Sequence, residues 1–374
     1  VSVSSTQRNA DANGIGEFRY TPPSGFLALC EDNLPTPTIA DPGEHFKTVL
    51  YTGDGNQGHS ITGVGFKPDL VWIKCRSHAD NHTLSDTVRG PGLALYSDLT
   101  NVEHVSNIRI QSFNDDGFTT GSSGDTNTSG RTFCAWCWKA GGAAVTNTDG
   151  SITSQVSVNQ DAGFSIVSWT SNGASSVVTT GHGLAKTPKF VLIKNRNATD
   201  NWFVYHSDIQ TNNRQYLQLN TNSTTLTLPS NDLWSTFDTS TFGVRQSAIA
   251  ANGAKIIAYC WTEIEGFSKF GSYVGNASAD GTFVYCGFKP AFILIKKTTG
   301  SDNWTIKSNH ISTNPNDYTI LPDLPDTEFG PNNTIIDFVS NGFKMRTTSG
   351  LVNGAETYVF AAFAESPFQT ANAK

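Results

Sequence analysis

The sequence predicts an all-β protein built from three tandem β-sandwich, jelly-roll-like domains. We expect these domains to come from an internal triplication and to follow a short extended N-terminal segment. Two observations lead to this prediction. An apolar phrase recurs three times along the 374 residues, and short β-branched or aromatic runs alternate with Asp-Gly, Asn-Gly and Ser-Gly turns. No segment carries the sustained i, i+3, i+4, i+7 apolar spacing of a helix.

The recurring phrase begins at a proline and ends at a lysine. It reads "PDLVWIK" at 68–74, "PKFVLIK" at 188–194 and "PAFILIK" at 290–296. Such near-continuous apolar runs predict strands that are buried on both faces or at an interface between sheets. We interpret the closing lysines, Lys74, Lys194 and Lys296, as strand-end side chains that carry their charge to solvent.

Further matches follow each copy in the same order. An Asp-Asn pair stands 12 and 13 residues after each proline, and a phenylalanine-bounded turn segment follows at 113–118, 237–242 and 338–343. An apolar-aromatic run closes each copy at 129–138, 252–261 and 353–363. A period of roughly 100 residues is the size of a whole domain rather than of a solenoid repeat. We therefore expect domains at 46–142, 143–268 and 269–374, each with a core of its own.

Two segments lie outside the repeated pattern. Residues 1–45 end in a proline-rich stretch that predicts a stiff connector. Residues 139–162 form a bridge between the first two copies, and "NTDGSIT" at 147–153 predicts a hairpin added to the second unit.

Charge and hydropathy narrow the classes of partner. The net charge is −7 and no Lys/Arg stripe is present, which argues against nucleic-acid binding. No apolar run approaches the length of a membrane span, so we expect no membrane association.

The six cysteines show no disulfide spacing. In "CAWC", an odd separation along a strand would point Cys134 and Cys137 to opposite faces, as expected for buried free thiols made in a reducing cytoplasm.

Motifs for catalysis and for cofactors are weak. "GDGNQG" at 53–58 has the spacing of a dinucleotide loop but precedes a strand-like segment, so we interpret it as a glycine-rich turn. The acidic loops at 114–117 and 278–281 leave calcium binding open, without a specific loop pattern. We expect no cofactor, no metal and no enzymatic activity. Glycoside hydrolysis stays an alternative, because its two catalytic carboxylates need to be close only in the folded protein and not along the sequence.

The most suggestive candidate site is a repeated Asp-Asn-aromatic triplet. It comprises Asp200, Asn201 and Trp202 in the second copy and Asp302, Asn303 and Trp304 in the third, while the first copy reads "DNH" at 80–82. Carboxylates and amides bind sugar hydroxyls, and an indole face binds a sugar ring. The interpretation that we favour is an Asp/Asn turn that enters a strand whose tryptophan packs in the core.

The stretches "GEFRYTPPSGFLALCEDNLPTPTI", "YTGDGNQGHSITGVGFKPDLVWIKCRS" and "EGFSKFGSYVGNASADGTFVYCGFKPAFILIKK" resemble a family of tailed-bacteriophage proteins. The family consists of structural or tail-fibre proteins, frequent in marine and cyanobacterial phages. They carry a repeated domain of unknown function downstream of SPRY-like domains. The resemblance covers the chain from about residue 14, and it brings no catalytic residues.

The resemblance implies a virion protein that is made in the bacterial cytoplasm, is assembled on the tail or head, and is a homotrimer as fibres usually are. The implied function is a tail-fibre or receptor-binding module that contacts a host-surface glycan or protein. The alternatives are a decoration, collar or spacer protein bound to other virion proteins, and a glycan-degrading tailspike. A binding tip should expose an aromatic patch on its last unit, around Trp304, whereas a spacer should bury such residues between units.

Overall fold

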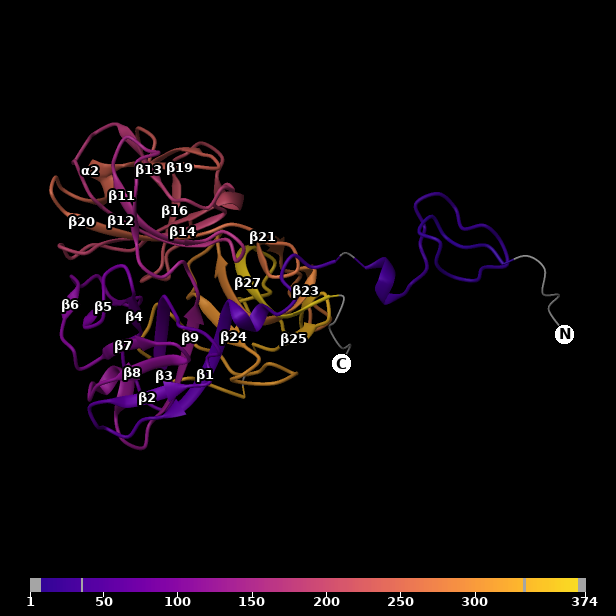
Figure 1. Ribbon diagram of the computed structural model, residues 1–374, viewed down its shortest axis with the longest axis horizontal. Helices are drawn as coiled ribbons and strands as arrows, with labels where there is room; N and C mark the ends of the chain where they lie inside the picture. Colours follow the sequence, from indigo (N-terminus) through magenta and orange to yellow (C-terminus); the bar gives the residue numbers. More distant parts are fainter. Residues whose placement is uncertain (1–7, 35, 332–333, 369–374) are drawn as a thin grey trace.

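The computed structural model describes residues 8–34, 36–331 and 334–368, and its strands fall into three units. Each unit contains a large sheet and a three-stranded sheet. Sheet membership changes between Trp138 and Val145 and again between Trp261 and Ser268. Figure 1 shows the first unit at the lower left, the second above it, and the third, in orange to yellow, beside both. The predicted all-β fold is confirmed.

The first unit has six strands in its large sheet. In spatial order these are β1 (Phe46–Thr52), β9 (Thr132–Trp138), β3 (Leu70–Cys75), β4 (Thr83–Asp86), β5 (Leu93–Tyr96) and β6 (His104–Val105). Its small sheet runs β2 (His59–Thr62), β8 (Gly117–Thr120) and β7 (Ile110–Asn114). A single helical turn, α1 (Gly124–Asn127), precedes β9.

The second unit has eight strands in its large sheet. In spatial order these are β10 (Val145–Asn147), β11 (Ser154–Asn159), β12 (Phe164–Thr170), β20 (Lys255–Trp261), β14 (Phe190–Asn195), β15 (Phe203–His206), β16 (Gln215–Gln218) and β17 (Leu226–Thr227). Its small sheet runs β13 (Val177–Gly181), β19 (Thr241–Arg245) and β18 (Trp234–Phe237). The short helices are η3 (Ser207–Ile209) and α2 (Gln246–Ile249).

The third unit has the smallest of the three large sheets, with four strands. Its large sheet runs β21 (Ser268–Val274), β27 (Thr357–Pro367), β23 (Phe288–Lys297) and β24 (Thr305–Ser308). Its small sheet runs β22 (Phe283–Tyr285), β26 (Gly342–Met345) and β25 (Ile336–Val339).

The same strand order occurs in all three units. The large sheets share the orders β1-β9-β3-β4, β12-β20-β14-β15 and β21-β27-β23-β24, and the small sheets share β2-β8-β7, β13-β19-β18 and β22-β26-β25. We call residues equivalent when they occupy the same place in these orders and registers. The repeated order is what a triplication would leave behind, and the triplication itself stays a prediction.

The expectation that each domain has a core of its own is wrong in one respect. The first and second units each bury an apolar cluster between their two sheets, but a further, larger cluster includes buried residues from all three units. The equivalent rings of Trp138, Trp261 and Phe363 meet inside it, with centroids 5.6 to 6.4 Å apart. The large sheets are apolar on both faces, so the face turned away from the small sheet must be covered by the other units.

Three smaller predictions can be compared with the structure. Cys134 belongs to the shared core and Cys137 to the core of the first unit, so the two free thiols do lie on opposite faces of β9. The glycine-rich loop 53–58 leads into β2 and not into a helix. The added hairpin is present as β10 and β11, where Val145 pairs with Val156.

The N-terminal segment differs from a simple extended connector. Residues 8–34 form a loop around Asp11, whose carboxylate accepts hydrogen bonds from the backbone of Asn13, Ile15 and Ala28 and from the side chain of Asn33. The loop carries η1 (Glu31–Asn33), and η2 (Pro42–Glu44) precedes β1. Figure 1 shows this loop standing away from the three units. Across the described ranges, no helix has the length and apolar character needed to cross a membrane.

Candidate functional site

The Asp-Asn-aromatic turns lie where neighbouring units meet. The Trp202 indole Nε1 donates to the backbone oxygen of Tyr96 in the first unit at 2.7 Å. The Trp304 Nε1 donates to the backbone oxygen of Gln218 in the second unit at 2.9 Å. In the first unit His82 takes the same place, with Nε2 lying 3.1 Å from the backbone oxygen of Leu321 in the third unit. The contacts run from the second unit to the first, from the third to the second and from the first to the third, and so close a ring.

The repeated lysines follow the same ring of contacts. Lys194 Nζ donates to the backbone oxygen of Thr100 at 2.8 Å, and Lys296 Nζ to that of Asn222 at 3.4 Å. Lys74 Nζ donates to the backbone oxygen of Pro325 at 3.0 Å. Each lysine also donates to the backbone oxygen of the aspartate in its own Asp-Asn turn.

The interpretation of these lysines as solvent-reaching side chains is therefore wrong. All three have no exposed surface, and burial lowers the pKa of Lys194 and of Lys296 to about 8. Burial also lowers the pKa of Lys74. Backbone carbonyls from two units take the place of water around each ammonium group, because a buried charge needs hydrogen-bond acceptors on every side.

A third polar group completes each interface. The backbone N–H of Trp202 donates to Asn220 Oδ1 at 2.8 Å, that of His82 to Asp98 Oδ1 at 3.1 Å, and that of Trp304 to Asp323 Oδ1 at 3.2 Å. Asn220 donates its Nδ2 to Asn201 Oδ1 at 2.8 Å. The Oδ2 atoms of Asp98 and Asp323 are buried without a hydrogen-bond partner. Burial raises the pKa of both carboxyls to about 7, against the opposing effects of backbone N–H groups and the nearby lysine.

The structure thus gives the predicted site residues a role at the unit interfaces. Trp202 and Trp304 are almost completely buried, so neither indole has a face open to a sugar ring. Asp200 and Asn201 are half-buried, as are Asp302 and Asn303, and their turns hold the lysine and the indole in place. This arrangement agrees with the turn-and-core interpretation and leaves ligand binding by the six residues without support from the geometry.

Another surface, on the third unit, has the features of a contact site. The outward residues of β22, Phe283 and Tyr285, are 45% and 57% exposed, while Val284 between them is buried. The pairing of β22 with β26 makes Phe283 and Tyr285 equivalent to Ser60 and Thr62 in the first unit. In the second unit the equivalent residues are Thr179 and Gly181. Only the third unit therefore presents aromatic rings at these positions.

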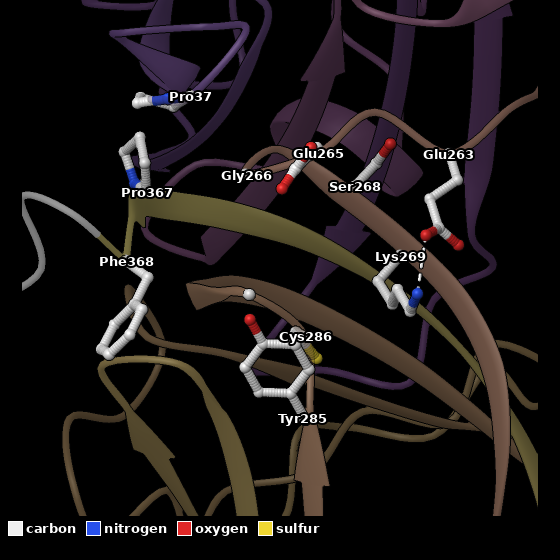
Figure 2. A pocket seen from close by; sticks show the side chains of 11 residues that line it. Pro37, Glu263, Glu265, Gly266, Ser268, Lys269, Tyr285, Cys286, Pro367 and Phe368 are labelled. Carbon is white, nitrogen blue, oxygen red and sulfur yellow. Dashed lines mark hydrogen bonds and ion pairs between the residues drawn. The ribbon is translucent and has the colours of Figure 1, made fainter. Parts of the chain in front are cut away.

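A groove with a volume of about 450 Å³ lies between β21 and β22 and is lined by Phe283, Tyr285, Tyr273 and Gly271. A pocket of about 230 Å³ adjoins it, sharing Tyr285 and Lys269. Figure 2 shows Glu263 and Lys269 paired at one end of this pocket, with Pro37 and Pro367 at the other. The Glu263 carboxylate lies 2.6 Å from the Lys269 ammonium.

The chemistry of this region suits binding. The pocket combines an aromatic ring and a charged pair, which are groups that orient a polar ligand or a peptide. The Ser268 hydroxyl is engaged within the fold, because it donates to the backbone oxygen of Thr262 and accepts from the backbone N–H of Ile264. Cys286 also lines the pocket, but burial raises its pKa, so the thiol is protonated at neutral pH and is a poor nucleophile.

The aromatic pair was missed from the sequence because "TFVYCGF" at 282–288 resembles an ordinary strand. One signal was available. Aligning the three copies on their prolines places Tyr285 beside Gly63 and Gly183, although it places Phe283 beside Ile61. The full contrast with Ser60 and Thr62 appears only in the strand register.

Other sequence candidates are engaged within the fold. In the loop 114–117, the Asp116 carboxylate accepts backbone N–H groups from Gly63 and Gly65, at 3.1 and 2.6 Å. In the loop 278–281, Asp280 lies 2.8 Å from the ammonium group of Lys344. No group of three or more metal-ligating side chains is found among the residues that the structure describes.

Comparison with known proteins identifies the family without a function. No curated protein and no solved structure gives a significant match to the chain. A family model described as Domain of unknown function (DUF7483) matches residues 41–367, which span all three units, and the chain belongs to that family.

Proposed function

We propose that the chain is a non-enzymatic structural component of a tailed-bacteriophage particle, of the tail-fibre or receptor-binding kind, and that its third unit carries the contact surface. The observation that carries this proposal is the aromatic pair Phe283 and Tyr285, which stands exposed where the other two units have Ser60, Thr62 and Thr179 or a glycine. Exposed aromatic side chains beside a groove are typical of contact surfaces.

The way in which the units are joined supports a structural role. The ring of lysine and indole hydrogen bonds, together with the shared core, joins the three units into one body. Such a body can present a surface at one end without changing shape. The partners that fit the proposal are other virion proteins and a host-surface glycan or protein, in a particle that carries the chain as a homotrimer.

The spacer alternative keeps one specific observation in its favour. Trp304 is buried between the third and second units, as expected for an aromatic residue in a spacer and not for one at a binding tip. A spacer would use the exposed pair on β22 to contact another virion protein instead of the host.

Adsorption of the purified chain separates these roles. The chain is incubated with intact host cells, with isolated host polysaccharide and with purified particles that lack it. A receptor-binding role predicts retention on cells or polysaccharide, and predicts that the double variant Phe283→Ser and Tyr285→Thr loses it. The matched control changes the equivalent residues of the first unit, Ser60→Ala and Thr62→Ala, and should adsorb normally.

Retention on particles alone would replace the receptor role by the spacer role. Absence of the chain from purified particles, measured by mass spectrometry, would overturn the virion assignment as a whole.

A further inference from the structure

The third unit leaves two neighbouring sheet edges without partners. β21 is the edge strand of its large sheet, and β22 is the edge strand of its small sheet. Within the described ranges, the only pairing on the outer side of β21 is a bridge from Ile264 to its first residue, Ser268. Exposed edges of this kind present unpaired backbone N–H and C=O groups, which are ready to pair with another strand.

The second unit shows what covers the same edges. There β11 pairs antiparallel with β12, the equivalent of β21, over the whole length from Ser154 to Asn159. The preceding residues reach β13, the equivalent of β22: Ile152 bridges Thr180, and the backbone N–H of Ser151 donates to Thr179 Oγ1 at 3.0 Å. Residues 150–159 thus close both edges of the second unit.

The register of β11 on β12 shows which type of side chain a strand that covers β21 would need at each position. Val156 and Val158 of β11 pack on the core between the two sheets of the second unit, and Val156 lies opposite Val167. The residue of β21 equivalent to Val167 is Gly271. The Phe360 ring, which also lines the groove, packs against Gly271, because a Cβ there would lie 3.1 Å from two of its ring atoms. At this place a covering strand would therefore direct its apolar side chain onto the Phe360 ring.

The aromatic side chains that line the groove also suit a docked strand with apolar residues. Phe283 and Tyr285 stand exposed along the groove on the β22 side, and Tyr273 lines it on the β21 side. Apolar side chains at alternate positions of a docked strand would bury these rings, while the backbone would satisfy the edge of β21.

We propose that the groove between β21 and β22 binds an extended strand of a partner protein, antiparallel to β21, with apolar residues at alternate positions as in β11. The partner strand opposite Gly271 directs one apolar side chain into the groove, and its neighbours two residues away contact the aromatic pair. The inference rests on the proposed function only in using the same contact surface, and it names a polypeptide as the partner.

The test attaches a candidate covering strand to the full-length protein and asks whether it protects β21. A second copy of residues 150–160, "GSITSQVSVNQ", is appended after Lys374 through a flexible Gly/Ser linker that keeps its local concentration high. Hydrogen exchange is then measured by mass spectrometry for β21, residues 268–274, and for β1 as the comparison edge. We expect exchange of the outward amides of β21 to slow by about tenfold or more, with β1 unchanged.

Two matched variants make the test specific. In the first, the appended copy carries aspartate in place of the valines that copy Val156 and Val158, and it should give no protection. In the second, the appended copy is unchanged but the groove carries Phe283→Ser and Tyr285→Thr, the residues of the first unit, and protection should fall. Both variants should fold, because serine and threonine occupy the equivalent exposed positions in the first unit and the aspartates lie only in the appended segment.

Equal exchange of β21 with the valine and the aspartate copies would overturn the proposal. So would slowing by isolated host polysaccharide in the absence of slowing by the strand, since the groove would then bind a glycan. The measurement uses purified protein alone, so a failure of the virion assignment leaves its outcome unaffected.

Discussion

The interface carboxyls Asp98 and Asp323 should make the stability of the protein depend on pH. Their equivalent in the second unit, Asn220, is a neutral amide that donates to Asn201 Oδ1. A protonated carboxyl has the same shape and is likewise neutral, so it avoids the cost of an ionised oxygen that is buried without a hydrogen-bond partner. We therefore expect Asp98 and Asp323 to be neutral in the folded protein at acidic pH and to ionise only as the pH approaches 7.

The sign and size of the effect follow from the pKa values. Burial raises the pKa of each carboxyl from 3.8 to about 7, so the fold favours the protonated form. The stability that this contributes is fully present below about pH 4 and is lost as the pH rises through 7. A shift of about three pKa units corresponds to an upper limit of about 4 kcal/mol at each site.

Charged groups near each carboxyl also titrate, so their pH ranges must be compared with that of the carboxyls. Lys74 and Asp125 lie near Asp98, and Lys296 and Asp302 lie near Asp323. The pKa of Lys296 is lowered to about 8, so its own contribution to stability changes between about pH 8 and 10.5. The carboxyl window, from pH 4 to 7, is therefore separate from that of Lys296. It overlaps the titration of His82, whose pKa burial lowers below 6.5 and whose effect on stability has the opposite sign, so the carboxyl contribution is read from the difference between the parent and the variant.

The assay is urea unfolding of the full chain at pH values from 4.5 to 7.5. The double variant Asp98→Asn and Asp323→Asn should lose much of the decline in unfolding free energy with rising pH, and it should be more stable than the parent at pH 7.5. The reciprocal variant Asn220→Asp should add a decline of the same sign. Unchanged pH dependence in the double variant would refute the assignment of neutral carboxyls.

Further predictions concern single contacts, each checked by the free energy of unfolding. Lys194→Met leaves buried carbonyls of two units without a donor, and should destabilise the protein by about 2–4 kcal/mol at pH 7; a neutral effect would mean that the ammonium is dispensable. Trp202→Phe keeps an aromatic ring but removes the donor to Tyr96, and should cost about 1–3 kcal/mol, whereas a loss below 0.5 kcal/mol would contradict the interface role. Gly117→Ala should cost about 2–4 kcal/mol because a Cβ there would lie 2.0 Å from the backbone oxygen of Ile61 at a φ of +140°, and a stable alanine variant would show that the pairing of β2 with β8 can shift.

Much of the local structure was predictable from sequence patterns. The all-β class, the added hairpin at 147–153 and the opposite faces of Cys134 and Cys137 all follow from turn residues and from the two-residue period of a strand. These features depend on neighbours in the chain, or on partners within one sheet.

The role of the repeated lysines and aromatic residues was decided only by the tertiary structure. Lys194 closes a strand in the same way whether it faces water or the carbonyl of Thr100, and the sequence contains no sign of which. The answer depends on a contact between units that are far apart along the chain.

The sequence by itself determined the all-β class, because periodicity and turn chemistry specify each strand locally. Only the tertiary structure decided that the three units share one core and that the Asp-Asn turns bind neighbouring units. It also decided that the edge of the third unit is lined by aromatic residues and, among the residues that the structure describes, is not covered by a further strand. The physical reason is that burial and hydrogen-bond partners are properties of surfaces brought together in space, and an apolar strand face is equally satisfied by any unit that covers it.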